Sequence, residues 1–235
     1  MTDSAPTFPP LMSGVAVEGG IDPFDKARSM AALGCDAGTV VHNIQVDRLR
    51  AAIVFAPEVA LEQAMAMLPV CGVGFQNALG ALAPPEVAVH LEWQGGIRVN
   101  NASCGRLRAA SSTTDPGALP DWLVIGLDLP LLQTATDPGA TPDVTSLYDE
   151  GCADVDPVQL IESWARHTLV WVNRWEDDGN RPLHAEWMGL LHGVGDPITM
   201  MGRQGRFLGV DDQFGMLIRD DETTHLIPLS QVLED

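Results

Sequence analysis

The chain has 235 residues, 46% of them hydrophobic, which is enough to bury a substantial core as one domain or one and a half. Its 32 acidic and 13 basic residues give a formal net charge of −19, and a surface so negative repels the phosphate backbone of nucleic acids. No apolar run approaches the roughly 20 residues that a membrane-spanning helix needs. The N-terminus has an acidic residue and prolines where an export signal has basic residues, so we predict a cytoplasmic, bacterial protein.

The first part of the chain predicts a mixture of helices and strands. A helix is expected over residues 22–34, with Asp22 as its N-cap. Short apolar runs rich in β-branched residues predict strands at 39–41 and 51–55. A long helical stretch follows over 57–80, and its internal proline and two glycines predict a kink or a split.

The centre of the chain predicts β-structure. Three strands are expected at roughly 87–93, 97–100 and 104–110, with a pair of asparagines in the second turn. A polar loop at 111–119, expected to have no fixed structure, separates them from a continuous apolar strand at 122–129.

The last part predicts helices followed by a small β unit. Residues 131–156 are polar and acidic, which is typical of a surface excursion. Amphipathic helices are expected at 157–176 and 183–191. Three short strands follow, too few to stand alone. We therefore predict a main domain over residues 1–195 and a small C-terminal β domain over 196–235.

The four cysteines favour neither a metal site nor a disulfide framework. Cys35, Cys71, Cys104 and Cys152 are far apart in sequence, and none forms a Cys-x-x-Cys pair or a cluster with histidine. We therefore predict reduced thiols and no bound metal.

The most informative motif lies in the centre. Leu91-Glu92-Trp93-Gln94-Gly95-Gly96-Ile97 predicts a strand that ends in Trp, a Gly-Gly turn and a second strand, and Cys104-Gly105-Arg106 follows in a third. In layout this resembles the biotin/lipoate protein ligase family, where Lys-Trp-Pro-Asn-Asp precedes a hairpin and a Lys-x-x-Gly-Ile strand. Glu92 stands where that family has its catalytic lysine, and the single lysine, Lys26, is far away in sequence.

Three further segments are similar to the same family, in the same order. Residues 21–24 fall where the family has an Asp-Ser-Thr-Asn helix start. Residues 124–129 match its Val-Ile-Gly-x-Gly-Ile-Asn strand near the ligand, with Gly126 kept and Asp128 in place of the second glycine. Residues 205–218 are similar to a turn in the C-terminal SH3-like domain of biotin ligases.

The resemblance implies a fold and a chemistry. The fold is α+β, a mixed sheet with flanking helices like the class II synthetase-type ligase catalytic domain, plus a small SH3-like β unit and without an N-terminal DNA-binding domain. Family ligases use ATP and Mg2+ to convert biotin, lipoate or a related acid to an acyl-adenylate, then transfer the acyl group to a lysine on a carrier domain. Such chemistry needs cations that hold the carboxylate and phosphate together.

The cations of this chain are not those of the family. The family's Gly/Arg-rich loop corresponds to residues 42–50, which lack every glycine, although Arg48 and Arg50 supply some charge. Arg106 is the nearest substitute for the missing lysine, but it could also pair with acids across an exposed sheet. Cys104 lies where a thiol nucleophile would resemble that of octanoyltransferases on the same fold, although a lone cysteine on an apolar strand is usually a small buried hydrophobe.

The candidate residues form two groups. The candidate catalytic residues are Arg106 and Cys104, and the candidate ligand-binding residues are Asn43, Arg48, Arg50, Glu92, Trp93, Gln94, Gly95, Gly96, Gly105, Gly126 and Asp128. Three functions stay open: a divergent ATP-dependent ligase, a catalytically inactive ligand-binding or regulatory protein on the ligase scaffold, and a Cys-dependent acyltransferase. The missing lysine and glycines favour the second, and the complete order of segments favours the first.

Overall fold

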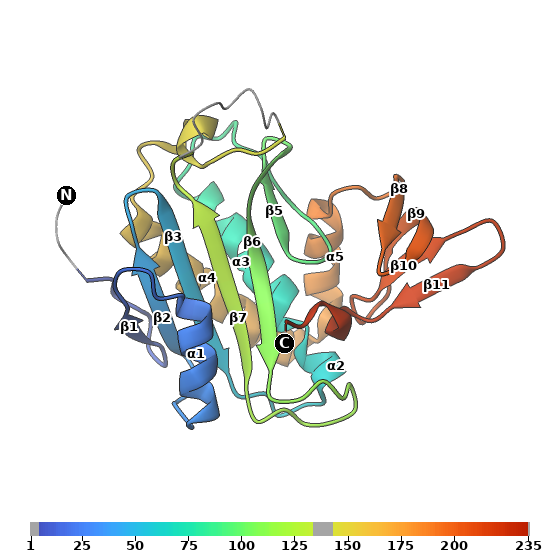
Figure 1. Cartoon of the computed structure of the whole chain (residues 1–235), viewed down its shortest axis with the longest axis horizontal. Helices are drawn as coiled ribbons and strands as arrows, with labels where there is room; N and C mark the ends of the chain where they lie inside the picture. The colour runs from blue at the N-terminus through green and yellow to red at the C-terminus, as the bar shows by residue number, and fades with distance from the viewer. Residues whose placement is uncertain (1–4, 134–142, 235) are drawn as a thin grey trace.

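The computed structural model describes residues 5–133 and 143–234 (Figure 1). Its main body is a seven-stranded mixed sheet in the order β1-β2-β3-β7-β6-β5-β4, and a separate four-stranded sheet has the order β11-β10-β9-β8. Among the strands of the described residues, only β1 pairs in parallel, with β2. Helix α1 covers one face of the large sheet, and α3 and α4 lie behind the other face (Figure 1). The predicted α+β class is therefore confirmed.

The bounds of the elements follow the chain. The strands of the large sheet are β1 Ser13–Ala16, β2 Thr39–Ile44, β3 Arg48–Phe55, β4 Val89–Leu91, β5 Gly96–Val99, β6 Ala102–Ser111 and β7 Leu123–Pro130. The strands of the small sheet are β8 Pro197–Met200, β9 Arg203–Val210, β10 Met216–Arg219 and β11 Thr224–Ile227. The helices are α1 Pro23–Ala32, α2 Leu61–Ala64, α3 Met67–Gly80, α4 Pro157–Asp178 and α5 Asn180–Leu190, with single turns η2 Tyr148–Cys152 and η3 Leu229–Val232.

Helix α1 forms where its local signals place it. The Asp22 carboxylate accepts a hydrogen bond from the backbone N–H of Phe24 at 2.9 Å, and Pro23 occupies the first turn. Phe24 packs over Gly126 of β7, where an added Cβ would lie 2.6 Å from the ring. Glycine is therefore required for α1 to approach the sheet this closely.

The long helical stretch divides at a different place from the one predicted. The break falls at Met65 and Ala66, between α2 and α3. Pro69 causes no break, because it lies in the first turn of α3, where its missing N–H has no helical partner to lose. The predicted positive-φ turn of Asn100 and Asn101 is confirmed, with φ of 49° and 73°.

Two predicted loops are more ordered than their composition indicates. The carbonyl groups of Pro116 and Ala118 accept hydrogen bonds from the first N–H groups of α2, so the expectation that this loop has no fixed structure was wrong. In the predicted surface excursion, Leu147 and Cys152 are fully buried. Residues 134–142 of that excursion lie outside the described part of the chain.

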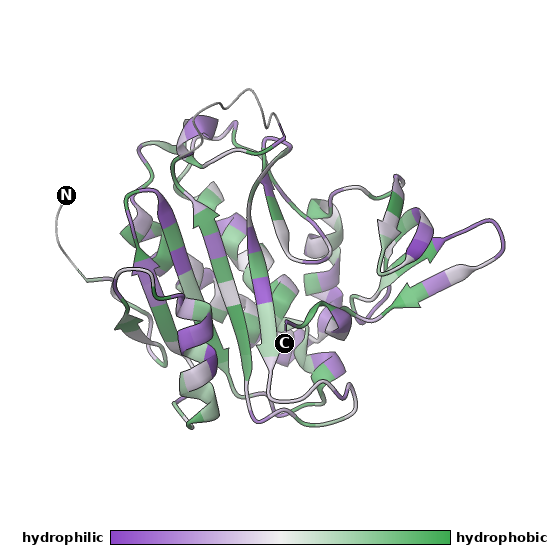
Figure 2. Cartoon of the chain, viewed as in Figure 1, coloured by the Kyte–Doolittle hydropathy of each residue, from purple (hydrophilic) through white to green (hydrophobic). Residues whose placement is uncertain are grey.

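The hydrophobic core lies mainly between the large sheet and the helices α3, α4 and α5. Hydrophobic residues follow β7 along most of its length (Figure 2). None of the described helices is long and apolar enough to cross a membrane. The small sheet has four strands where three were predicted, and it joins the core through Trp93. The indole Nε1 of this buried residue donates to the carbonyl of Phe214 at 2.8 Å.

Replacement of Trp93 by Phe should lower the free energy of unfolding by about 1–3 kcal/mol, because the buried carbonyl of Phe214 would lose its donor. Urea denaturation measures the change. Trp122→Phe is the matched control, since Trp122 is only partly buried. An equal loss of stability in both variants would contradict a specific role for the Trp93 hydrogen bond.

Candidate ligand site

One row of residues crosses five strands of the large sheet near its upper end in Figure 1. The backbone register places Asn43 of β2 opposite Arg50 of β3, and Arg50 opposite Asp128 of β7. Asp128 lies opposite Arg106 of β6, which lies opposite Gly96 of β5. Residues directly opposite each other in a sheet point to the same face. These five positions, here called the arginine row, were all expected at the site, and the fold brings them together.

The arginine row lies on the face of the sheet that carries α1. Gly126 faces the ring of Phe24, and Asp128 is two residues farther along the same strand, so it points to the same side. Arg108 follows Arg106 by two residues and also contacts Phe24, with its guanidinium 4.1 Å from the ring centroid. The row therefore adjoins the N-terminal end of α1.

Asp128 is held by a neighbouring arginine. Arg48 donates from Nε to Oδ1 at 2.5 Å and from Nη2 to Oδ2 at 2.9 Å, which is the bidentate geometry that matches a guanidinium to a carboxylate. This hydrogen bond raises the pKa of Arg48 above its usual value. Arg48 is thus paired within the protein.

Arg108 is also paired. It contacts Asp22, the N-cap of α1, at 2.8 Å, and it contacts the Glu234 carboxylate through Nε at 2.8 Å and Nη2 at 2.7 Å. Burial alone would lower the pKa of Arg108, but the bonds with Glu234 and Asp22 outweigh this effect and raise it. The backbone N–H of Glu234 donates to the carbonyl of Ala109, so the C-terminal segment follows β6 at this point. No local sequence signal could have indicated Glu234, because it is 126 residues from Arg108.

Glu92 stands at the end of the arginine row, with its carboxylate above Gly96. Arg98 donates to it from Nε at 2.6 Å, so its charge is balanced inside the protein. Glu92 stands in place of the family's lysine and adds a negative charge to this part of the sheet. The ion pair removes this excess of negative charge.

The residues that follow Glu92 shape the turn. The side chain of Trp93 is 2% exposed and belongs to the core, whereas Gln94 is exposed. Gly95 has φ of +98°, and an added Cβ would lie 2.6 Å from the carbonyl oxygen of Leu107. Gly105, with φ of +144°, permits a similar approach to the backbone of Asp128. Trp93 and these glycines therefore position the site without offering it a side chain.

Two arginines of the row have no partner among the described residues. Neither Arg50 nor Arg106 makes an ion pair or a side-chain hydrogen bond there, and Nε of Arg50 is buried without an acceptor. Arg106 is exposed, whereas Arg50 is half-buried. They flank Asp128, whose charge Arg48 balances, so an anion on this surface meets two unpaired guanidinium groups.

The connection between β2 and β3 is a tight hairpin. It consists only of Gln45-Val46-Asp47, and the N–H of Gln45 donates to the carbonyl of Arg48 at 2.8 Å. The segment compared with a Gly/Arg-rich loop thus lies mostly within strands. The side-chain amide of Asn43 donates to the carbonyls of Gly19 and Ile21, which holds the segment before α1 in place.

Cys104 is not placed as a nucleophile. Its thiol is buried in the core between the sheet and the helices, and burial raises its pKa to about 12. Nearby Glu150 raises the pKa further, whereas activation requires a nearby cation. Arg106 lies on the opposite, α1 face of the sheet. Among the described residues, no three His, Cys, Asp or Glu side chains converge to hold a metal ion.

The comparisons with known proteins agree with this architecture. The sequence model of the biotin/lipoate A/B protein ligase family matches residues 8–189. The chain belongs to this family. A second model, for a domain of unknown function, matches residues 194–235. Among curated proteins, none matches the chain significantly.

Solved structures extend the comparison. A biotin protein ligase-like protein of unknown function from a Silicibacter species is 63% identical, with a TM-score of 0.94 over 98% of this chain and 100% of that chain. The apo biotin protein ligase of Aquifex aeolicus is 16% identical, with a TM-score of 0.73 over 94% and 96%. The Leishmania major ligase in complex with biotinyl-5-AMP is 16% identical, with a TM-score of 0.58 over 93% and 99%. At such identities the two ligases share the fold with this member of the family.

Iodoacetamide at pH 8 should leave Cys104 unmodified in the folded protein, because a thiol with a pKa of about 12 is ionised in only about one molecule in 10,000 at that pH. Peptide mass spectrometry should find the label on half-buried Cys35. In guanidinium chloride all four cysteines should react. Rapid labelling of folded Cys104 would restore the acyltransferase hypothesis.

Proposed function

We propose that this family member binds a small molecule that carries one carboxylate, and that the carboxylate lies between the guanidinium groups of Arg50 and Arg106. The observation that supports this is the pattern of pairing along the arginine row. Among the described residues, three of the arginines around the row have internal carboxylate partners, and Arg50 and Arg106 do not. A planar guanidinium matches a carboxylate in shape and charge.

The charge of the whole protein makes this surface distinct. The chain carries a net charge of −19, so a diffusing anion is repelled over most of the molecule. Arg50 and Arg106 form a local positive surface, where an anion is attracted instead. The buried Nε of Arg50 also lacks an acceptor, which is costly for a polar group unless a ligand supplies one.

Related structures indicate which acids to test first. The Aquifex aeolicus ligase has been solved in complex with biotin and ATP. Biotin, lipoate and octanoate each combine one carboxylate with an apolar body.

The described residues of the arginine row suit a carboxylate better than they suit a nucleoside triphosphate such as ATP. A triphosphate requires backbone N–H groups at close range and several free cations. The hairpin at Gln45–Asp47 has no glycine, and Arg48 and Arg108 are occupied by internal carboxylates. This combination favours binding of the acid without its activation by ATP.

Retained ligase activity is the second candidate, because the chain keeps the family's order of elements through α5. ATP–pyrophosphate exchange in the presence of each acid distinguishes the two. We expect no exchange, and exchange that depends on one acid would establish activation of that acid. In that event Lys26→Ala tests whether the single lysine, which is exposed on α1, takes part.

Arg50→Ala and Arg106→Ala should each weaken binding of the acid about tenfold or more, because a hydrogen bond to a charged group contributes about 1.5–3 kcal/mol. Isothermal titration calorimetry measures the affinity, and the primary amide of the same acid should bind poorly to the unaltered protein. Arg166→Ala, on α4 in the helix layer, is the control. Equal affinity for acid and amide would contradict the proposal.

A further inference from the structure

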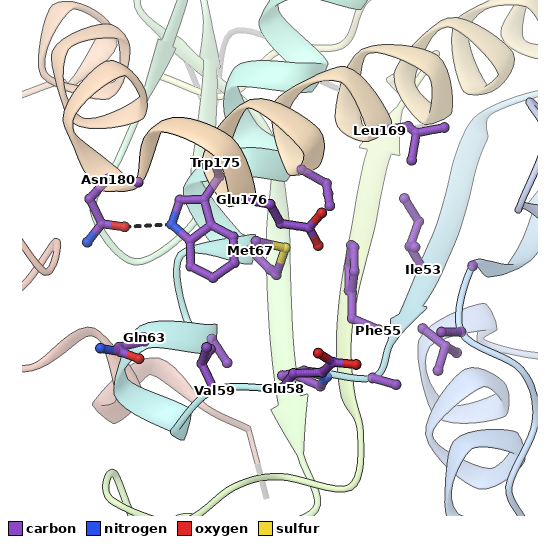
Figure 3. Close-up of a pocket in the computed structure, with 18 of the residues that line it drawn as sticks. Ile53, Phe55, Glu58, Val59, Gln63, Met67, Leu169, Trp175, Glu176 and Asn180 are labelled. Atoms are coloured by element: carbon purple, nitrogen blue, oxygen red, sulfur yellow. Dashed lines mark hydrogen bonds between the residues drawn. The ribbon is translucent and has the colours of Figure 1, made fainter.

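A large groove lies away from the arginine row, at the opposite end of β3. Its volume is about 1220 Å³, and it separates the end of β3 from the C-terminal half of α4 (Figure 3). The row crosses β3 at Arg50, whereas the groove begins at Ile53 and Phe55. The two features therefore use different ends of the same strand.

The walls of the groove are largely apolar. Phe55 and Val59 form one side, and Met67, Val172 and Trp175 come from the helices. Figure 3 shows the ring of Trp175 beside Met67. Such a surface attracts an apolar molecule, because its burial removes hydrocarbon from water.

The aromatic wall is fixed in orientation. Nε1 of Trp175 donates to Oδ1 of Asn180 at 2.6 Å, and Nδ2 of Asn180 donates to the carbonyl of Asp212 at 2.7 Å. The indole ring is thus held by its edge. A ring that is already ordered loses little entropy when a ligand binds against it.

The groove also carries carboxylates that lack partners in the protein. Glu58 follows β3, Glu176 lies on α4, and Figure 3 shows their carboxylates on either side of the Phe55 ring. Neither makes an ion pair or a side-chain hydrogen bond with a described residue. Arg181 and Asp212 also line the groove, next to Asn180, where their charges offset each other. The excess charge around Phe55 is therefore negative.

We propose that this groove binds an apolar molecule that carries a permanent cationic group of the quaternary ammonium type. The cation lies between Glu58 and Glu176, against the aromatic ring of Phe55, and the apolar body follows the groove past Met67 towards Trp175. Aromatic faces attract weakly hydrated cations, and nearby carboxylates add Coulomb attraction. This site does not depend on the proposed carboxylate site, because no residue of the arginine row lines the groove.

The test compares octyltrimethylammonium with 1-octanol, which shares its alkyl chain but has no charge. Calorimetric titration of the full-length protein should show tighter binding of the ammonium, and its affinity should fall as salt is added. Glu58→Gln and Glu176→Gln should each weaken ammonium binding about two- to fivefold and leave octanol binding unchanged. Asp177→Asn, an exposed neighbour on α4 outside the groove, is the control.

A second measurement locates the ligand. With 13C-labelled methionine methyl groups, the Met67 signal should shift on binding, and the signal of Met216, which is buried in the small sheet, should not. Equal affinity for ammonium and octanol, an unchanged affinity in the Glu58/Glu176 double variant, or an unmoved Met67 signal would each overturn the proposal.

Discussion

The guanidinium of Arg108 joins three parts of the chain that are remote in sequence. It binds the N-cap residue of α1, stacks over Phe24, and binds Glu234 near the C-terminus, while β6 carries it at the centre of the sheet. Its side chain is only 14% exposed, so both ion pairs are partly shielded from water. The position of α1 beside the arginine row, and hence the shape of the proposed carboxylate site, depends on these contacts.

The fold of the ligase family persists here with a different distribution of charge. In the described residues, carboxylates of the protein itself occupy Arg48, Arg98 and Arg108. These ion pairs offset most of the positive charge of the surface. Two guanidinium groups, those of Arg50 and Arg106, stay unpaired among the described residues. The tight hairpin between β2 and β3 also makes this surface less suited to a large anion, because it leaves no flexible loop to enclose one. The chain thus keeps the architecture of the family with its own arrangement of charged side chains.

Local features of the fold were predictable from sequence, and long-range ones were not. Asp22 as N-cap and the Asn100-Asn101 turn each depend on a few consecutive residues. The candidate residues of the row were named individually, but their alignment depends on the pairing of Arg50 with Asp128 across 78 residues of chain. The ion pair of Glu92 with Arg98 was also not predictable, because it depends on the pairing of β4 with β5. The break before α3 was misplaced, since Pro69 is harmless in a first helical turn.

The C-terminal part of the chain, from the β9–β10 hairpin to Glu234, contacts residues beside both proposed sites. Glu234 reaches Arg108 beside the arginine row, and the hairpin that contains Asp212 holds Asn180 and, through it, Trp175. A ligand that favoured one position of this segment at either place would change the affinity at the other by the same factor, since such linkage is reciprocal. If both proposed ligands bind, this part of the chain, which includes the small sheet, is the physical connection through which an anionic and a cationic ligand would be thermodynamically coupled.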